Sequence, residues 1–152
     1  MSGSFAVPTA ILEGQLWISG CPIDHEWLRR EGIDLVVDVA DPHLLLAADR
    51  LGTTTYRKEA LVDGPELPAT AILDELVRDV VTAVTGGRRV LVACAGGRNR
   101  SGLVLGLALR ELLACSGAEA LCLVQSRRED ALNNATFAQH LAALPPPPRR
   151  QP

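Results

Sequence analysis

The sequence predicts an α/β fold, a single domain in which a central, mostly parallel sheet of about four or five strands is flanked by helices. Short apolar runs typical of buried strands alternate along the chain with longer segments in which apolar residues recur at helical spacing. Residues 90–93 are four consecutive apolar residues, as in a central parallel strand, and residues 69–85 form a strongly amphipathic pattern. A length of 152 residues and a hydrophobic fraction of 47% suit one domain with a sizeable core.

In the first half of the chain, strands and helices are expected in alternation. Residues 16–19, 35–39 and 53–58 are predicted strands, and residues 24–30 and 42–51 are predicted helices. Asp24 is the expected N-cap of the first helix, because its side chain can accept a hydrogen bond from a free N–H of the first turn. The strand at 53–58 is predicted from its β-branched and aromatic residues.

The second half of the chain contains the longer predicted helices. Residues 61–68 are a predicted loop, and residues 90–93 are a predicted strand. Helices are predicted at residues 69–85 and 102–115. Two further helices are expected to begin at the capping box Ser116–Glu119 and at Asn133 or Asn134. The segment 102–115 is apolar nearly all round, which indicates a buried helix. The domain is expected to span residues 1–144, and the Pro/Arg-rich residues 145–152 are predicted to be a disordered tail.

Charge and hydropathy narrow the classes of function. The formal net charge of −3 argues against a general nucleic-acid binder. The N-terminus shows no signal-peptide pattern, and no apolar run is long enough to span a bilayer, so a cytoplasmic protein without a membrane partner is expected. Its four cysteines are then expected to be reduced, and their spacings match no zinc pattern. The oligomeric state is left open.

The run from Cys94 to Ser101 carries the most chemistry. It lies where a predicted buried strand passes into a predicted buried helix, so free backbone N–H groups at the helix start can bind an anion. Ala95, Gly96 and Gly97 allow close approach of the backbone, and Arg100 can grip two phosphate oxygens with its planar fork. The same positive surroundings favour a thiolate over a thiol at Cys94, which makes it a candidate nucleophile.

This run resembles the loop of the cysteine-dependent protein phosphatases, nearest to the compact dual-specificity type. Their loop reads His-Cys-x-x-Gly-x-x-Arg-Ser/Thr, and this chain matches it at Cys94, Gly97, Arg100 and Ser101. Further segments look like that fold: residues 16–20, 32–39, 63–68, 127–134 and Phe137, so the resemblance covers roughly residues 12–144. One departure is Ala93, where the family usually has the histidine that braces the loop and the thiolate.

The resemblance implies a mechanism and a role for each residue. Cys94 would attack phosphorus and form a phosphocysteine, while Arg100 and the backbone N–H groups of Ala95, Gly96, Gly97, Arg98 and Asn99 hold the phosphate oxygens. Asp63 would protonate the leaving group and then activate water, and Ser101 would donate a hydrogen bond to the thiolate. No metal or cofactor is expected. The expected substrates are phosphotyrosine and also phosphoserine and phosphothreonine in proteins, or small phosphomonoesters.

Several residues also have structural interpretations. Asp63 could merely shape a turn, Ser101 could be a helix N-cap, and Asp38 and Asp41 are competing carboxylates that are expected to end a strand or cap a helix. The side chains of Arg98 and Asn99 are expected to face outward. Arg88, Arg89, Arg98, Arg100, Arg127 and Arg128 could surround an anion site, although a solvated side chain is favoured for Arg88, Arg89, Arg127 and Arg128.

Rival functions are weighed on the same residues. A Walker loop is excluded, because Leu103 and Val104 stand where lysine and Ser/Thr are required. The Arg100-Ser101 ending and Asp63 favour phosphate over sulfur transfer. A catalytically weak phosphoprotein-binding module on the same fold is the alternative that Ala93 supports. Phosphoinositides and RNA 5′-phosphates remain open as alternative substrates.

Overall fold

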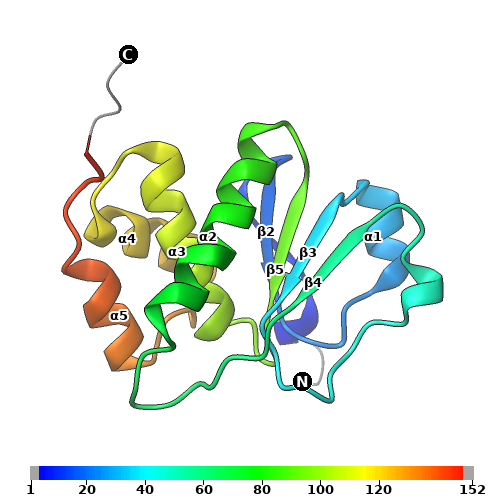
Figure 1. Ribbon diagram of the computed structural model, residues 1–152, viewed down its shortest axis with the longest axis horizontal. Helices are drawn as coiled ribbons and strands as arrows, with labels where there is room; N and C mark the ends of the chain where they lie inside the picture. Colours follow the sequence, from blue (N-terminus) through cyan, green and yellow to red (C-terminus); the bar gives the residue numbers. More distant parts are fainter. Residues whose placement is uncertain (1–3, 149–152) are drawn as a thin grey trace.

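A computed structural model describes residues 4–148 as a sheet with helices on both faces (Figure 1). The strands are β1 (Thr9–Leu12), β2 (Leu16–Ser19), β3 (Leu35–Asp38), β4 (Thr55–Lys58) and β5 (Val90–Ala93), in the order β1-β2-β5-β3-β4. β1 runs antiparallel to β2, and every other neighbouring pair is parallel. The predicted α/β class with a mostly parallel sheet is therefore confirmed.

The helices form two unequal layers. They are α1 (His25–Glu31), α2 (Thr70–Thr85), α3 (Arg100–Leu113), α4 (Gly117–Arg127) and α5 (Ala135–Ala142), with short 3-10 turns at Ser4–Ala6 and Ala48–Arg50. α1 lies on one side of the sheet, while α2 to α5 lie on the other (Figure 1). No helix within residues 4–148 has both the length and the apolar character that a membrane span needs.

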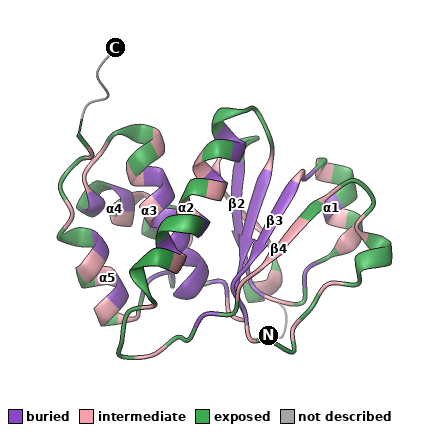
Figure 2. Cartoon of the chain, viewed as in Figure 1, coloured by how far each residue is buried: buried purple, intermediate pink, exposed green. Residues whose placement is uncertain are grey.

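Alternation along β5 divides the core into two clusters. Val90 and Val92 point into the larger cluster under α2 to α5, and Leu91 and Ala93 point into the smaller one under α1. All four side chains are fully buried, because helices cover both faces of the central strand (Figure 2). The continuous apolar run that predicted this strand is thus explained by its position.

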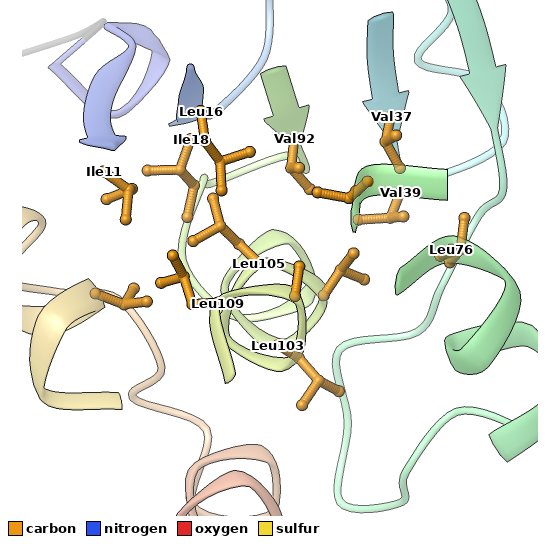
Figure 3. Packing of buried hydrophobic residues seen from close by; sticks show 14 of the residues in the cluster. Ile11, Leu16, Ile18, Val37, Val39, Leu76, Val92, Leu103, Leu105 and Leu109 are labelled. Atoms are coloured by element: carbon orange, nitrogen blue, oxygen red, sulfur yellow. The ribbon is translucent and has the colours of Figure 1, made fainter. Parts of the chain in front are cut away.

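α3 is the helix that fills the space between the sheet and the outer helices. Leu105 points toward β2, whereas Leu103 points away from the sheet toward the outer layer (Figure 3). Both are fully buried, as the all-round apolar pattern predicts. The helix begins at Arg100, two residues earlier than the apolar pattern begins, so the polar end of the motif lies inside its first turn.

The local start signals are confirmed. The side chain of Asp24 accepts hydrogen bonds from Glu26 N at 2.9 Å and Trp27 N at 3.3 Å at the start of α1. Ser116 and Glu119 form both bonds of the capping box, and Asn134 is the N-cap of α5. These signals were readable because each joins residues within one turn.

The helix predicted at 42–51 is wrong, since only Ala48–Arg50 forms a 3-10 turn there. Lys58 Nζ donates hydrogen bonds to the carbonyls of Asp41 at 2.8 Å and Leu44 at 2.7 Å. These carbonyls therefore accept from a side chain distant in sequence and not from the N–H groups of a helix.

β1 was not predicted. It is a four-residue edge strand whose register shifts between Ala10 and Leu12.

The chain after α5 packs at its beginning against α3. Arg110 Nε donates to the carbonyl of Pro145 at 2.6 Å, and residues up to 148 adopt no regular structure. Residues 149–152 lie outside the described residues. The division into a domain of residues 1–144 and a tail of residues 145–152 therefore stays a prediction.

Gly117 offers a test of packing at the start of α4. A Cβ built there would lie 1.7 Å from the carbonyl oxygen of Leu141, a backbone atom that cannot move aside alone. We expect Gly117→Ala to lower the free energy of unfolding by about 1–3 kcal/mol through overpacking, although alanine is the better helix former. Urea unfolding measures the change.

Gly106→Ala in α3 is the control, because its Cβ would meet only the end of the flexible Leu141 side chain, Cδ2 at 2.5 Å. It should cost less than Gly117→Ala. Equal stability of Gly117→Ala and the wild type would contradict the packing described here.

Candidate active site

The candidate nucleophile lies at the carboxyl end of the central strand. Ser19 and Asp38 pair with Ala93 from either side, so the next residue, Cys94, leaves the sheet between β2 and β3. Carboxyl ends of parallel strands at such a position commonly form ligand sites. Cys94 is only 2% exposed, and its Sγ lies 3.1 Å from Oγ of Ser101, in the first turn of α3. The structure therefore brings together the thiol and the hydroxyl that the motif predicts.

The loop between them is held from outside by its carbonyl groups. The carbonyls of Ala95, Gly97 and Arg98 accept hydrogen bonds from Cys21 N at 3.0 Å, Arg128 Nε at 2.7 Å and Leu132 N at 2.9 Å. In a planar trans peptide the N–H points opposite to the carbonyl. The N–H groups of the residues that follow these three carbonyls are therefore directed to the other, inner side of the loop.

Those inner N–H groups are free to receive a ligand. Within residues 4–148, no backbone N–H of residues 95–99 has a hydrogen-bond acceptor. Gly97 has a φ of 63°, which favours glycine, and a Cβ there would lie 2.5 Å from Gly20 N. A ring of unpartnered N–H groups at the start of a helix is suited to an anion.

Arg100 presents one edge of its guanidinium to the protein and keeps the other free. Its Nη1 donates to Asp41 Oδ1 at 2.8 Å and to the carbonyl of Leu61 at 3.1 Å. The Arg100 residue is only 7% exposed, and its Nε is buried without a hydrogen-bond partner among the described residues. A buried donor without an acceptor is costly, so a bound anion that accepted its hydrogen bond would be stabilised there.

Asp41 has a different role from the helix cap that was expected. No helix begins beside it, and its carboxylate instead pairs with Arg100. The hydrogen bond and the positive charge of Arg100 hold the pKa of Asp41 below its ordinary value. Sequence reasoning missed this partner, because nothing in the local pattern around Asp41 indicates an arginine so distant in the chain.

Asp63 is held by asparagine side chains on both of its oxygens. Its Oδ2 accepts from Asn99 Nδ2 at 3.0 Å, and its Oδ1 accepts from Asn134 Nδ2 at 2.8 Å. Asn99 Nδ2 also donates to Asn133 Oδ1 at 2.7 Å, and Asn99 Oδ1 accepts from Asn134 N at 2.8 Å. The loop that carries Asp63 is thereby fastened to the candidate anion site and to the start of α5.

One prediction about this segment is wrong, and one alternative interpretation is excluded. The Asn99 side chain faces inward and is only 8% exposed, because it joins three separate stretches of the chain. Ser101 is not the N-cap of α3, since the helix begins at Arg100 and Asn99 precedes it. The side chain of Arg98 does face outward, with Asp130 at 3.9 Å.

Asp38 and Cys21 also lie near the site, but their surroundings favour structural roles. Asp38 ends β3 as expected, and its buried carboxylate accepts from the Tyr56 hydroxyl at 2.5 Å and lies 3.3 Å from Lys58 Nζ. Burial and Asp38 raise the pKa of Tyr56. Burial, Asp38 and Cys94 raise the pKa of the Cys21 thiol to about 11, which disfavours Cys21 as a nucleophile at neutral pH.

The arginines expected to be solvated divide into two groups. Arg127 is about half exposed and lies 3.8 Å from Glu13, and Arg88 is exposed, so the expectation holds for these two. It is wrong for Arg89, which stacks 5.0 Å from the Trp17 ring, and for Arg128, which binds the loop. Among the described residues, no group of three or more His, Cys, Asp or Glu side chains could hold a metal.

Comparisons with known proteins agree with this architecture. No family model matches the chain, and no curated protein is a significant sequence match. Among solved structures, human DUSP28 is 24% identical with a TM-score of 0.76, over 88% of this chain and 89% of that one. Tk-PTP in the active form is 25% identical with a TM-score of 0.75, over 93% of this chain and 98% of that one.

PTPMT1 in complex with PI(5)P is 17% identical with a TM-score of 0.71, over 90% of this chain and 97% of that one. The chain thus has the fold of the dual-specificity and tyrosine phosphatases. The resemblance to the cysteine-dependent phosphatases that the Cys94-to-Ser101 run indicates is confirmed in the fold.

The ion pair of Asp41 with Arg100 predicts a pH dependence. Because the pKa of Asp41 is lowered in the folded state, its stabilising contribution is present above the unfolded value of about 4 and is lost as the pH falls further. Wild type should therefore exceed Asp41→Asn in stability at neutral pH, and this difference should shrink below about pH 4. Urea unfolding from pH 7 to pH 3 measures it.

Asp49→Asn is the matched control, since Asp49 is exposed and forms no ion pair within residues 4–148. A difference between the wild type and Asp41→Asn that widened toward low pH would contradict the assignment.

Proposed function

We propose that this protein is a cysteine-dependent phosphatase, which hydrolyses phosphate monoesters through a phosphocysteine intermediate. The observation that carries the proposal is the buried Arg100 Nε without a partner, beside a loop whose N–H groups at 95–99 also lack acceptors, among the described residues. These donors complement the oxygens of a phosphate. The buried sulfur of Cys94 lies at the foot of the same loop. The shared phosphatase fold supports the same conclusion.

In the proposed first step, the Cys94 thiolate attacks phosphorus. The S–P bond forms as the bond from phosphorus to the leaving oxygen breaks, and Asp63 gives that oxygen a proton. Arg100 and the loop N–H groups hold the other phosphate oxygens while charge shifts among them. Asn99 and Asn134 orient the Asp63 carboxyl for this transfer, since they bind both of its oxygens.

In the second step, water attacks the phosphocysteine and gives a proton to Asp63. The S–P bond breaks and inorganic phosphate forms, with Cys94 leaving as a thiolate. Ser101 stabilises that leaving thiolate by donating a hydrogen bond, which its 3.1 Å separation from Sγ supports. The chemistry proposed here uses no metal or cofactor. It requires a reduced Cys94, which fits the cytoplasmic location expected from the sequence.

Phosphorylated proteins are the substrates we propose, with phosphotyrosine and also phosphoserine or phosphothreonine. Phosphoinositides and RNA 5′-phosphates are the alternatives; the first class includes PI(5)P, with which PTPMT1 forms its complex.

A catalytically weak phosphate-binding module is the second candidate. Ala93 favours it, because a methyl group can neither hydrogen-bond nor carry charge beside the nucleophile. Cys94 and Asp63 favour turnover. The two candidates differ in one measurable quantity, the rate of phosphate release.

Turnover of an aryl phosphate tests the proposal. The purified protein should hydrolyse it in the presence of a chelator, and vanadate should inhibit the reaction. Cys94→Ser should lower kcat to background, because the hydroxyl is a far weaker nucleophile than a thiolate, while inorganic phosphate should still bind. Phosphate binding without turnover by the wild type would favour the binding module, and undiminished activity of Cys94→Ser would exclude Cys94 as nucleophile.

A substrate comparison tests the acid. Asp63→Asn should lower kcat by about 10²–10⁴ for an alkyl phosphate, whose leaving oxygen needs a proton. The loss should be much smaller for an aryl phosphate with a good leaving group. Glu66→Gln is the matched control, because Glu66 is an exposed carboxylate on the same loop and forms no hydrogen bond or ion pair within residues 4–148. Equal losses for both substrates would argue against Asp63 as the general acid.

A further inference from the structure

Arg128 follows α4 and directs its guanidinium to the back of the loop. Its Nε donates to the carbonyl of Gly97 at 2.7 Å, and its Nη1 donates to the carbonyl of Val7 at 2.9 Å and to Thr9 Oγ1 at 2.8 Å. Its Nη2 donates to the carbonyl of Phe5. The side chain thus fastens the loop to the segment that enters β1.

The hydrogen bond to Gly97 determines how one peptide of the loop is turned. With its carbonyl directed outward to Arg128, the peptide joining Gly97 to Arg98 directs the Arg98 N–H to the opposite, inner side. The two other fastened carbonyls, at Ala95 and Arg98, are held by backbone N–H groups. Arg128 therefore supplies the side-chain bond on which the orientation of a loop carbonyl depends.

Arg128 also carries a positive charge, and its guanidinium lies against the back of the loop that follows Cys94. Burial lowers the pKa of Arg128, and a negative charge on Cys94 raises it, so the two charges attract each other. Among the described residues Arg128 forms no salt bridge, whereas Arg100 is paired with Asp41 and Arg98 lies near Asp130. Asp130 raises the pKa of Arg128 from a distance, but no carboxylate pairs directly with Arg128 among the described residues.

We propose that Arg128 is a positioning residue of this site, which turns the Gly97–Arg98 peptide toward the bound phosphate and stabilises the Cys94 thiolate from behind the loop. The inference rests on the proposed function. Arg128, which lies outside the motif, would then hold the loop in place, a role that the methyl group of Ala93 cannot fill. Substrate would contact the loop and not Arg128 itself.

The test compares Arg128→Met with Arg89→Met and Arg128→Lys. Arg89 is a matched control, because it is also half-buried and bonds the carbonyls of Gly14 at 2.9 Å and Glu31 at 2.7 Å. It precedes β5, whereas Cys94 follows that strand, so it lies at the far end of the sheet. Arg128→Lys keeps the charge but loses the fork that joins four acceptors.

Three quantities are measured for each variant: the Kd of inorganic phosphate by calorimetry, the rate of Cys94 alkylation against pH, and the urea midpoint. We expect Arg128→Met to weaken phosphate binding about tenfold or more and to move the alkylation curve to higher pH. Arg128→Lys should restore part of the alkylation shift but less of the phosphate affinity. Arg89→Met should lower the urea midpoint and leave Kd and the alkylation curve unchanged.

An unchanged Kd and alkylation curve in Arg128→Met would overturn the proposal. So would an equal loss of phosphate affinity in Arg89→Met, since the effect would then follow from lower stability. If Arg128→Met does not fold, the same comparison is made with Arg128→Lys, whose wild-type Kd would overturn the proposal. Failure of the wild type to bind phosphate would instead count against the proposed function.

Discussion

The orientation of the peptide groups between Cys94 and Arg100 is the constraint on which the site depends. Three of these peptides have a carbonyl that is hydrogen-bonded on the outer side of the loop, which directs the N–H of the same peptide inward. Cys21 after β2, Arg128 after α4 and the backbone of Leu132 supply those outer donors. The loop is therefore preorganised by contacts behind it, and an anion needs to displace no internal hydrogen bond of residues 95–99.

The sheet explains why this loop lies where a reactive group is useful. β5 is central, so the residue that follows it emerges between β2 and β3, with helices covering both faces of the sheet. α3 begins at Arg100, directly after the loop, and is buried along most of its length, which leaves its N-terminal dipole poorly screened by water. The charge of Arg100 acts in the same place, shared with Asp41 from the loop after β3. The elements that build the core thus also build the electrostatic field at Cys94.

Asn99 connects the chemistry of the two proposed steps. Its side-chain Nδ2 donates to both Asp63 and Asn133, and its side-chain Oδ1 accepts a hydrogen bond from the backbone N–H of Asn134. The candidate acid, the anion loop and the start of α5 consequently behave as one hydrogen-bonded unit. A displacement of the loop at 61–68 would be transmitted to the residue that precedes Arg100.

Sequence alone was sufficient where the determining interactions are local. The apolar run of β5, the helical spacing of α2 and the caps at Asp24 and Ser116 each depend on residues within a turn or on one strand. The motif from Cys94 to Ser101 belongs to the same class, because its thiol, arginine and hydroxyl follow one another through one strand–loop–helix junction. The α/β class and the motif residues of the candidate site could therefore be predicted.

Tertiary structure decided everything that depends on partners far apart in the chain. Residues 42–51 have helical composition, yet the helix does not form, and Lys58 instead donates hydrogen bonds to the carbonyls of Asp41 and Leu44. Asp41 was expected to cap that helix and instead pairs with Arg100, while Asn99 and Arg128 turn inward to acceptors on other elements. A side chain's hydrogen-bond partner is set by which elements pack together, and packing brings such groups within about 3 Å regardless of their separation in sequence.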